Sequence, residues 1–272
     1  MVNAAKRVLV FDSGVGGLSV LDAIAASEHA LSLDYVADNA WLPYGLKSDA
    51  DLRARVPALL ARITEQWSPD ALVVACNTAS TIVLPDMREA LSIPVVGVVP
   101  PIKPAAALTK TGVIGLLATP ATVQRTYTDD LITRFAADKR VVRFGSAALV
   151  EAAERKLRGE AFDPAAVHEA IDALFADGAV DVVALACTHF PLLAQELAAA
   201  APRSCTWLDS GAAIARRVVD VTGAAQGDAH TERAGFTDPD AARTSFHVFE
   251  TRGFSSFACI SDAPSYAVTP LT

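Results

Sequence analysis

Two cysteine-centred segments carry residue types that could do chemistry. Cys76-Asn77-Thr78 and Cys187-Thr188-His189 each follow a short apolar run and precede a stretch with helical spacing. A thiolate is a small base and nucleophile, and the free N–H groups at a helix N-terminus favour it. A lone cysteine after a strand is most often a buried structural residue. Two cysteines in matched settings favour a chemical role instead.

Two further segments place polar residues at the ends of predicted strands. Asp12-Ser13-Gly14 follows the first apolar run, and Thr119 follows another, with Thr122 three residues later. Open parallel sheets bind ligands outside the carboxyl ends of their strands, and a helix N-terminus at that edge favours an anion. These segments predict a site for a small anionic ligand. Thr119 before Pro120 is also a good helix start, so capping is an alternative role for the two threonines.

Other chemistries use some of the same residues. Gly14-Val15-Gly16-Gly17 resembles the start of a dinucleotide fingerprint, but its third glycine would fall at Ser19. Cys187 and His189 could form a nucleophile–base pair for acyl transfer, and with Cys76 they could bind zinc, although the spacing is a weak ligand signature. No lysine stands at any of these strand ends to form a Schiff base with pyridoxal phosphate. We therefore expect neither a metal nor a cofactor.

Alternating strand and helix patterns must position these residues. Short β-branched runs predict strands, and Ala/Leu-rich stretches between them predict helices. Apolar strands followed by helices are typical of a parallel sheet covered on both faces, so the fold class is α/β. The expected strands are 7–12, 33–37, 71–75, 94–98, 112–117, 140–144, 181–186 and 204–208, and the expected helices are 17–27, 49–66, 78–91, 122–137, 164–176, 191–200 and 211–222.

The chain also shows a faint internal repeat. The segment 70–78, around Cys76, is similar to the segment 181–189, around Cys187, and a proline-rich stretch at 95–104 separates them. This pattern predicts two similar parallel-sheet α/β domains with the active site between them. The expected first domain is 1–98 plus 211–272, and the second is 99–210.

Composition excludes several classes of protein. Of 272 residues, 52% are hydrophobic and 20% charged, which excludes a disordered chain. A net charge of −8 argues against partners such as nucleic acid or an anionic membrane surface. The four cysteines form no C-x-x-C pair, and no apolar run is typical of a signal peptide or a membrane span. We expect a cytoplasmic protein with free thiols.

The motifs resemble those of the glutamate racemases, within the cofactor-independent aspartate/glutamate racemase family. The similar segments run from Val8 to about Gly223, and beyond it no motif matches. Ser80 and His189 follow the glutamate pattern rather than the aspartate pattern. The segments that carry the resemblance are 11–20 (FDSGVGGLSV), 43–45 (PYG), 75–80 (ACNTAS) and 186–193 (ACTHFPLL).

This resemblance implies roles for the site residues. Cys76 would deprotonate D-glutamate and Cys187 L-glutamate, each on its own face of Cα. Asp12 would be the partner of Cys76, and His189 and Glu151 would act on the Cys187 side. The residues implied in substrate binding are Asp12, Ser13, Tyr44, Gly45, Asn77, Thr78, Thr119, Thr122, Thr188 and His189.

The resemblance also implies a place in the cell. The enzyme would supply D-glutamate for peptidoglycan, and so serve cell-wall biogenesis and cell shape, without a cofactor and, by analogy, as a homodimer. Three alternatives remain open: a racemase of aspartate or another acidic amino acid, a Cys–His hydrolase that leaves Cys76 unexplained, and a ligand-binding protein without catalysis.

Overall fold

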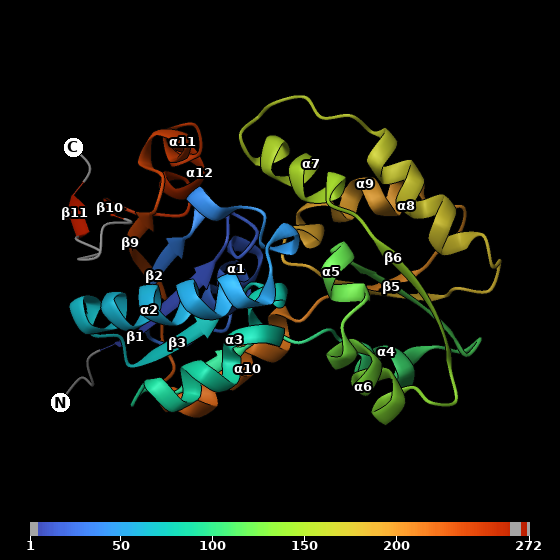
Figure 1. The fold of residues 1–272 in the computed structure, drawn as a ribbon, viewed down its shortest axis with the longest axis horizontal. Helices are drawn as coiled ribbons and strands as arrows, with labels where there is room; N and C mark the ends of the chain where they lie inside the picture. The colour runs from blue at the N-terminus through green and yellow to red at the C-terminus, as the bar shows by residue number, and fades with distance from the viewer. Residues whose placement is uncertain (1–4, 262–267, 271–272) are drawn as a thin grey trace. The chain divides into compact units, whose positions relative to one another are not determined.

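A computed structural model of the chain describes residues 5–261 and 268–270. The chain divides into two compact units. The first unit comprises Met1–Val98 and Gly211–Thr272, and the second comprises Val99–Ser210. Each unit is built around its own sheet (Figure 1).

The first unit contains a seven-stranded sheet in the order β11-β10-β9-β2-β1-β3-β4. Every neighbouring pair is parallel except β10 and β11, which are antiparallel. Valine, leucine and phenylalanine fill the central strands, as expected where both faces are covered. The strands are β1 (Lys6–Asp12), β2 (Leu31–Ala37), β3 (Ala71–Val74), β4 (Val95–Gly97), β9 (His230–Phe236), β10 (Ser256–Ile260) and β11 (Val268–Pro270).

Helices cover this sheet on both faces (Figure 1). Leu9 and Phe11 of β1 join a buried cluster with side chains of α2 and α3, which pack on each other. Helices α1 and α10 pack together on the opposite face. The helices are α1 (Leu18–Ala25), α2 (Asp49–Trp67), α3 (Asn77–Ala90), α10 (Gly211–Thr222), α11 (Pro239–Arg243) and α12 (Phe246–Glu250), with short 3₁₀ turns η1 (Asn39–Trp41) and η2 (Tyr44–Leu46).

The segment after Gly223, in which no motif matches, extends this sheet. Strand β9 pairs with β2, and β10 pairs with β9. Its core is aromatic: the ring of Phe236 lies 5.1 Å from that of Phe249, and the ring of Phe246 lies 4.5 Å from that of Phe257. Strand β9 has the sequence HTERAGF, with polar residues in its first half, so no continuous apolar run predicts a strand there.

The second unit contains a four-stranded parallel sheet in the order β6-β5-β7-β8. Side chains of β5 and β7 pack with Ile102 and Ala105 of α4 on one face. On the other face α8 comes so close that a Cβ on Gly115 would lie 3.3 Å from Leu174. The strands are β5 (Val113–Ala118), β6 (Arg140–Gly145), β7 (Val182–Ala186) and β8 (Thr206–Leu208).

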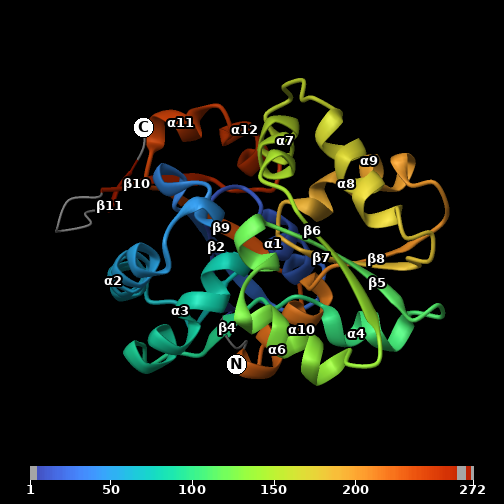
Figure 2. The same cartoon turned by 45° about the vertical axis from the view of Figure 1, so that its right-hand side comes forward.

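The helices of this unit differ in part from those expected. The single helix expected over 122–137 is two helices, because Arg125 adopts an extended conformation with ψ 140°. The helix expected over 191–200 begins as a 3₁₀ turn, and α4 and α7 were not expected. The elements are α4 (Ile102–Leu108), α5 (Pro120–Val123), α6 (Thr126–Phe135), α7 (Ala148–Leu157), α8 (Ala165–Phe175), η3 (Phe190–Leu193) and α9 (Ala194–Ala200) (Figure 2).

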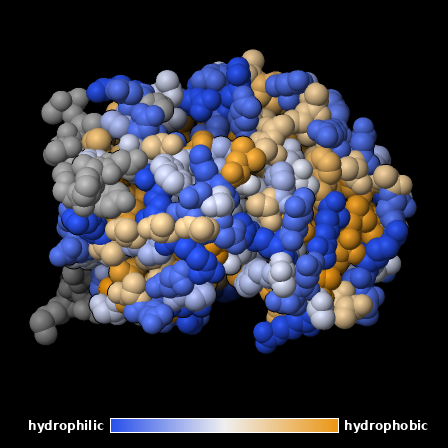
Figure 3. Space-filling model, in the orientation of Figure 1, coloured by the Kyte–Doolittle hydropathy of each residue, from blue (hydrophilic) through white to orange (hydrophobic). Residues whose placement is uncertain are grey.

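The prediction of two parallel-sheet α/β units is confirmed, and so are the eight strands expected within them. The face seen in Figure 3 is a mosaic of hydrophilic and hydrophobic residues. Within the part of the chain that the structure describes, no helix is both long and apolar enough to span a membrane.

Candidate active site

In the first unit, the predicted acid/base residues follow two adjacent strands. Asp12 is the last residue of β1, and Cys76 follows β3 by two residues. Phe11 pairs with Val74, so the two chain segments leave the sheet side by side. Asp12 is fully buried, and its Oδ1 accepts a hydrogen bond of 3.0 Å from the backbone N–H of Gly14.

Ser13 connects this carboxylate with the thiol. Its Oγ lies 3.5 Å from Asp12 Oδ1 and 3.9 Å from Cys76 Sγ. Cys76 is the N-terminal cap of α3 and is 7% exposed. A thiol at the start of a helix, beside a hydroxyl, is in a setting that favours its thiolate.

Close packing behind Asp12 explains one of the glycines in the loop. A Cβ on Gly17 would lie 2.7 Å from Asp12 Cβ, 2.7 Å from Tyr35 Oη and 3.2 Å from Ala75 Cβ. Tyr35 in turn donates a hydrogen bond of 2.7 Å to the carbonyl of Gly14. The loop after β1 is therefore held against the sheet, and Gly17 allows this close approach.

Asn77 and Thr78, the first residues of α3, are buried next to the thiol. Among the described residues, Asn77 Oδ1 has no hydrogen-bond partner. A buried acceptor without a partner costs about 1–3 kcal/mol, so such an atom calls for an explanation. Ser80, by contrast, binds the backbone: its Oγ donates to the Val74 carbonyl at 2.7 Å and accepts from the Val98 N–H at 3.1 Å.

Tyr44 is held by a buried ion pair that the sequence analysis did not find. Its hydroxyl donates to Asp38 Oδ2 at 2.5 Å, and Arg55 binds both oxygens of the same carboxylate at 2.7 Å. Thr237, after β9, donates to Asp38 Oδ1 at 2.8 Å. Burial, followed by the negative charge of Asp38, raises the pKa of Tyr44 well above its ordinary value. Gly45 lies next to Tyr44 and is half-buried.

The second unit repeats this arrangement of strand ends. Ala118 of β5 pairs with Ala186 of β7, so Thr119 and Cys187 leave the sheet at the same edge. Thr119 caps α5 by accepting the N–H of Thr122, and the two hydroxyls lie 2.9 Å apart. Both threonines are buried, as is Thr188. The capping role considered for Thr119 is thus observed.

Cys187 belongs to a buried chain of three side chains. Its Sγ lies 3.8 Å from Nδ1 of His189, and His189 Nε2 lies 2.8 Å from Oε1 of Glu154 on α7. Burial alone would lower the pKa of His189. Hydrogen bonds to Cys187 and Glu154 outweigh it and raise that pKa well above its ordinary value. The imidazole is therefore held beside the thiol with a bias towards its charged form.

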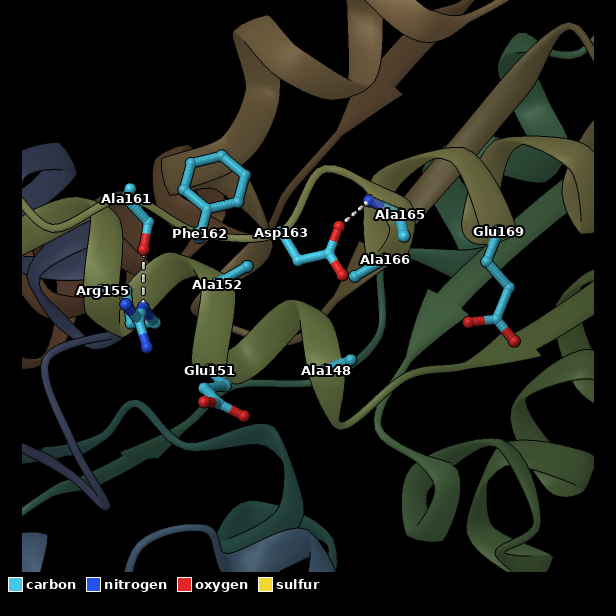
Figure 4. A pocket seen from close by; sticks show the side chains of 10 residues that line it. All are labelled: Ala148, Glu151, Ala152, Arg155, Ala161, Phe162, Asp163, Ala165, Ala166 and Glu169. Carbon is cyan, nitrogen blue, oxygen red and sulfur yellow. Dashed lines mark hydrogen bonds between the residues drawn. The ribbon is translucent and has the colours of Figure 1, made fainter.

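The resemblance implied Glu151 beside Cys187, but the Glu151 side chain lies on the exposed face of α7. Its side chain is exposed and lines a pocket of about 540 Å³ between α7 and α8 (Figure 4). The pocket also contains Asp163, Glu169 and Arg155, so it carries more negative than positive charge and does not suit a dicarboxylate. The carboxylate in contact with His189 is Glu154 instead, and the role of Glu151 stays a prediction.

The sequence contains a signal for a buried carboxylate at Glu154. Glu154 stands four residues after Val150, which puts both on one face of a helix. Val150 is apolar and buried, so a carboxylate at the same face of α7 is expected to be buried and paired. Arg55 and Asp38 offer no comparable signal, since they are 17 residues apart on different elements.

Comparisons with known proteins agree with this architecture. A sequence profile of the family described as Asp/Glu/Hydantoin racemase matches residues 13–218. The glutamate racemase of Sphingopyxis alaskensis is 52% identical over 218 residues, which cover 79% of this chain and 81% of that protein. The glutamate racemase of Pectobacterium atrosepticum is 51% identical over 211 residues, covering 77% and 74%.

Among solved structures, the chain is similar to Escherichia coli glutamate racemase in complex with L-glutamate and the activator UDP-MurNAc-ala. The TM-score is 0.85 at 43% sequence identity, covering 93% of this chain and 97% of that one. The match therefore includes most of the segment after Gly223, where the sequence showed no motif.

Proposed function

Because the chain belongs to the Asp/Glu/Hydantoin racemase family, we propose that it is a glutamate racemase that interconverts L- and D-glutamate by a two-thiol acid/base mechanism. The relatives named glutamate racemase support glutamate as the substrate. One observation supports the mechanism above all others. In each unit a buried cysteine at a strand end lies beside a group linked to a buried carboxylate.

Inversion at Cα needs two acid/base groups. One removes the proton from one face, and the other returns a proton to the opposite face without turning the substrate over. Cys187 deprotonates L-glutamate while Cys76 delivers a proton to the other face, and the roles exchange in the reverse direction. The proposed reaction uses neither a metal nor a cofactor, because no lysine stands at these strand ends to bind pyridoxal phosphate and the spacing of Cys76, Cys187 and His189 is a weak metal-ligand signature.

Each thiol has its own partner. On the Cys76 side, Asp12 is linked to the thiol through the Ser13 hydroxyl. On the Cys187 side, His189 is in direct contact with the sulfur. Because the partners differ, the two proton transfers depend differently on pH, although each thiol acts as base in one direction and as acid in the other.

The remaining site residues hold the substrate. Asn77 Oδ1, buried and without a partner among the described residues, suits the α-ammonium group, which can only donate hydrogen bonds. The helix starts after Cys76 and Thr119 offer N–H groups and a favourable dipole to the two carboxylates. Ser13, Thr78, Thr122, Thr188, Tyr44 and Gly45 complete the proposed pocket.

The wider role follows from the product. D-Glutamate supplied by this reaction enters peptidoglycan, so the enzyme serves cell-wall biogenesis and cell shape. It works in the cytoplasm as two domains, 1–98 plus 211–272 and 99–210, each of which contributes one thiol. By analogy with the family, two copies form a homodimer.

A chiral assay tests the reaction. Purified protein is incubated separately with L-glutamate, L-aspartate and L-alanine, and the products are separated by chiral chromatography. We expect D-glutamate to accumulate until the two enantiomers are equal, with far slower reaction of the other amino acids. Equal efficiency on aspartate would change the assignment to a broader acidic amino-acid racemase, and no inversion of any substrate would refute it.

Solvent deuterium tests the two-thiol mechanism separately. In heavy water Cys187 takes protium from L-glutamate, while Cys76, whose exchangeable hydrogen is already deuterium, supplies the other face. Mass spectrometry at low conversion should show deuterium at Cα of D-glutamate and protium in the recovered L-glutamate. Protium in the first D-glutamate formed would contradict two independent thiols and favour a single base.

A further inference from the structure

We propose that the segment after β9 takes part in substrate binding: Thr237 is a positioning residue that holds the substrate loop, residues 38–46, which carries Tyr44 and Gly45. This inference rests on the proposed function, in which that loop contacts glutamate. It gives a role to a part of the chain in which no motif matches. It is carried by hydrogen bonds between residues that are 199 positions apart in the sequence.

These contacts continue the pairing of β2 with β9 beyond the ends of both strands (Figure 1). The last pair in the register is Ala37 with Phe236, and the N–H of Thr237 then donates to the Ala37 carbonyl at 3.2 Å. Beyond this point a side chain replaces the backbone of β2. Asn39 Nδ2 donates to the Asp238 carbonyl at 2.7 Å, and Asn39 Oδ1 accepts from the Asp238 N–H at 2.9 Å. The amide of Asn39 therefore pairs with the backbone as a neighbouring strand would, and it fixes the start of the substrate loop.

The hydroxyl of Thr237 joins two parts of the substrate loop. It donates to Asp38 Oδ1 at 2.8 Å and accepts from the backbone N–H of Ala40 at 3.0 Å. Thr237 and Asp38 are both buried, so the carboxylate depends on protein groups for its hydrogen bonds. A hydroxyl has a single hydrogen to donate, and here that hydrogen is given to Asp38.

Asp38 passes this constraint on to Tyr44. Each of its oxygens accepts two hydrogen bonds: Oδ1 from Thr237 and Arg55, and Oδ2 from Arg55 and Tyr44. An ionised carboxylate offers about four acceptor sites, so those of Asp38 are filled and its plane has one orientation. Without the Thr237 hydroxyl, one site at Oδ1 is empty and the N–H of Ala40 loses its acceptor. The substrate loop then keeps Arg55 but loses the bond that links Asp38 to the end of β9.

The expected consequence is for substrate binding rather than for the chemical step. A loop that samples other conformations binds glutamate only in the fraction of molecules that hold the binding conformation, so the apparent dissociation constant rises. Saturating glutamate restores that conformation, so kcat is retained. A merely structural role would instead lower the stability of the fold and the amount of active enzyme, and it would leave KM unchanged.

Removing one hydroxyl distinguishes these two roles. T237V deletes the hydroxyl and keeps the shape of the side chain. We expect KM for L- and D-glutamate to rise about 3- to 10-fold, the factor that corresponds to one hydrogen bond, with kcat as in the wild type. T231V is the matched control, because Thr231 lies on β9 and its hydroxyl donates at 2.7 Å to the carbonyl of Arg252, outside the substrate loop. It should leave KM unchanged. T237S keeps the hydroxyl and should restore KM towards the wild type.

Hydrogen exchange, measured by mass spectrometry without glutamate, follows the substrate loop directly. Backbone N–H groups of η1 and η2 donate to carbonyls of the same loop, so their exchange reports on its opening. We expect T237V to exchange faster than the wild type in a peptide that covers residues 38–47, and T231V to exchange like the wild type. N39A removes the amide that pairs with the segment after β9. It should have the same effects as T237V, and it replaces T237V as the test if T237V does not fold.

The inference is overturned if T237V leaves KM unchanged, if T231V raises KM as much, or if T237S behaves like T237V. A wild-type chain that does not racemise glutamate would refute the proposed function, and the exchange of T237V and T231V would still decide whether Thr237 holds the loop. A chain that racemises glutamate, with a T237V variant that exchanges and reacts like the wild type, would refute this inference alone.

Discussion

The buried ion pair beneath Tyr44 predicts a large and specific loss of stability in D38N. Asp38 is fully buried and Arg55 is 9% exposed. Their carboxylate and guanidinium form two hydrogen bonds of 2.7 Å, and the same carboxylate also accepts from Tyr44 and Thr237. Asparagine retains one acceptor oxygen, turns an N–H₂ group towards existing donors and removes the negative charge that faces the Arg55 guanidinium.

The expected change in the free energy of unfolding follows from the loss of this ion pair. Removing one partner of a buried ion pair destabilises a protein by about 3–5 kcal/mol, because the other charge remains buried. The same substitution at Asp86 is a matched control. Asp86 binds Arg53, also on α2, at 2.6 Å, but the two side chains are 39% and 49% exposed. An exposed pair contributes about 0–1 kcal/mol, so D86N should be nearly neutral.

Urea unfolding measures the difference. The ring of Trp41 lies under the guanidinium of Arg55, with its centroid 4.5 Å from Cζ, so this one of the three tryptophans contributes fluorescence that reports on the ion pair. We expect D38N to lower the urea midpoint far more than D86N with similar slopes. Replacing both partners, in D38N/R55M, should recover part of the loss because no buried charge is left alone. If D38N and D86N differed by less than about 0.5 kcal/mol, a typical spread for surface substitutions, the reasoning would be refuted.

Three further predictions concern the thiols, the absence of a cofactor and pH. Cys76→Ala and Cys187→Ala should each abolish racemisation, because each removes the acid/base group of one face; near-wild-type turnover in either, by the chiral assay, would contradict two thiols. Activity should survive exhaustive dialysis against a chelator, and the absorption spectrum should show no pyridoxal phosphate; loss of activity that zinc restores would overturn this. Because the pKa of His189 is raised in the folded state, His189 should stabilise the fold fully below pH about 6.5, its ordinary pKa, and progressively less as pH rises through the folded value. The measurement is the difference in unfolding free energy between the wild type and H189A as a function of pH. A difference that grew with pH would contradict the prediction.

The sequence predicted structure best where burial of apolar side chains alone decides it. Strands of buried parallel sheets are continuous apolar runs, so Val8–Phe11 and Val182–Leu185 were predictable from composition alone. The same runs predict where the polar residues that follow them lie, at the carboxyl ends of the strands. Cys76 and Cys187 do lie at the strand ends of their units.

Other features depend on contacts between distant parts of the chain. Strand β9 has few apolar residues, and what holds it is pairing with β2 and an ion pair from Arg233 to the fully buried Asp34. The resemblance implies that Tyr44 binds substrate, but the environment of its side chain depends on Asp38 and on Thr237, far along the chain. Local patterns carry no information on such pairings, because tertiary packing decides them.

The two thiols have different partners, and the equilibrium between the enantiomers limits which kinetic constants can reveal that difference. L- and D-glutamate have equal free energies in water, so kcat/KM must be the same in both directions for any variant. A change confined to the His189 side, such as E154Q, therefore cannot favour one direction in kcat/KM, even though it acts on Cys187 alone. In the proposed two-thiol mechanism, it can change kcat and KM unequally, since saturating L-glutamate and saturating D-glutamate load the site with different thiols in the basic role. The asymmetry between Ser13–Asp12 and His189–Glu154 should thus be sought in the pH dependence of the two kcat values.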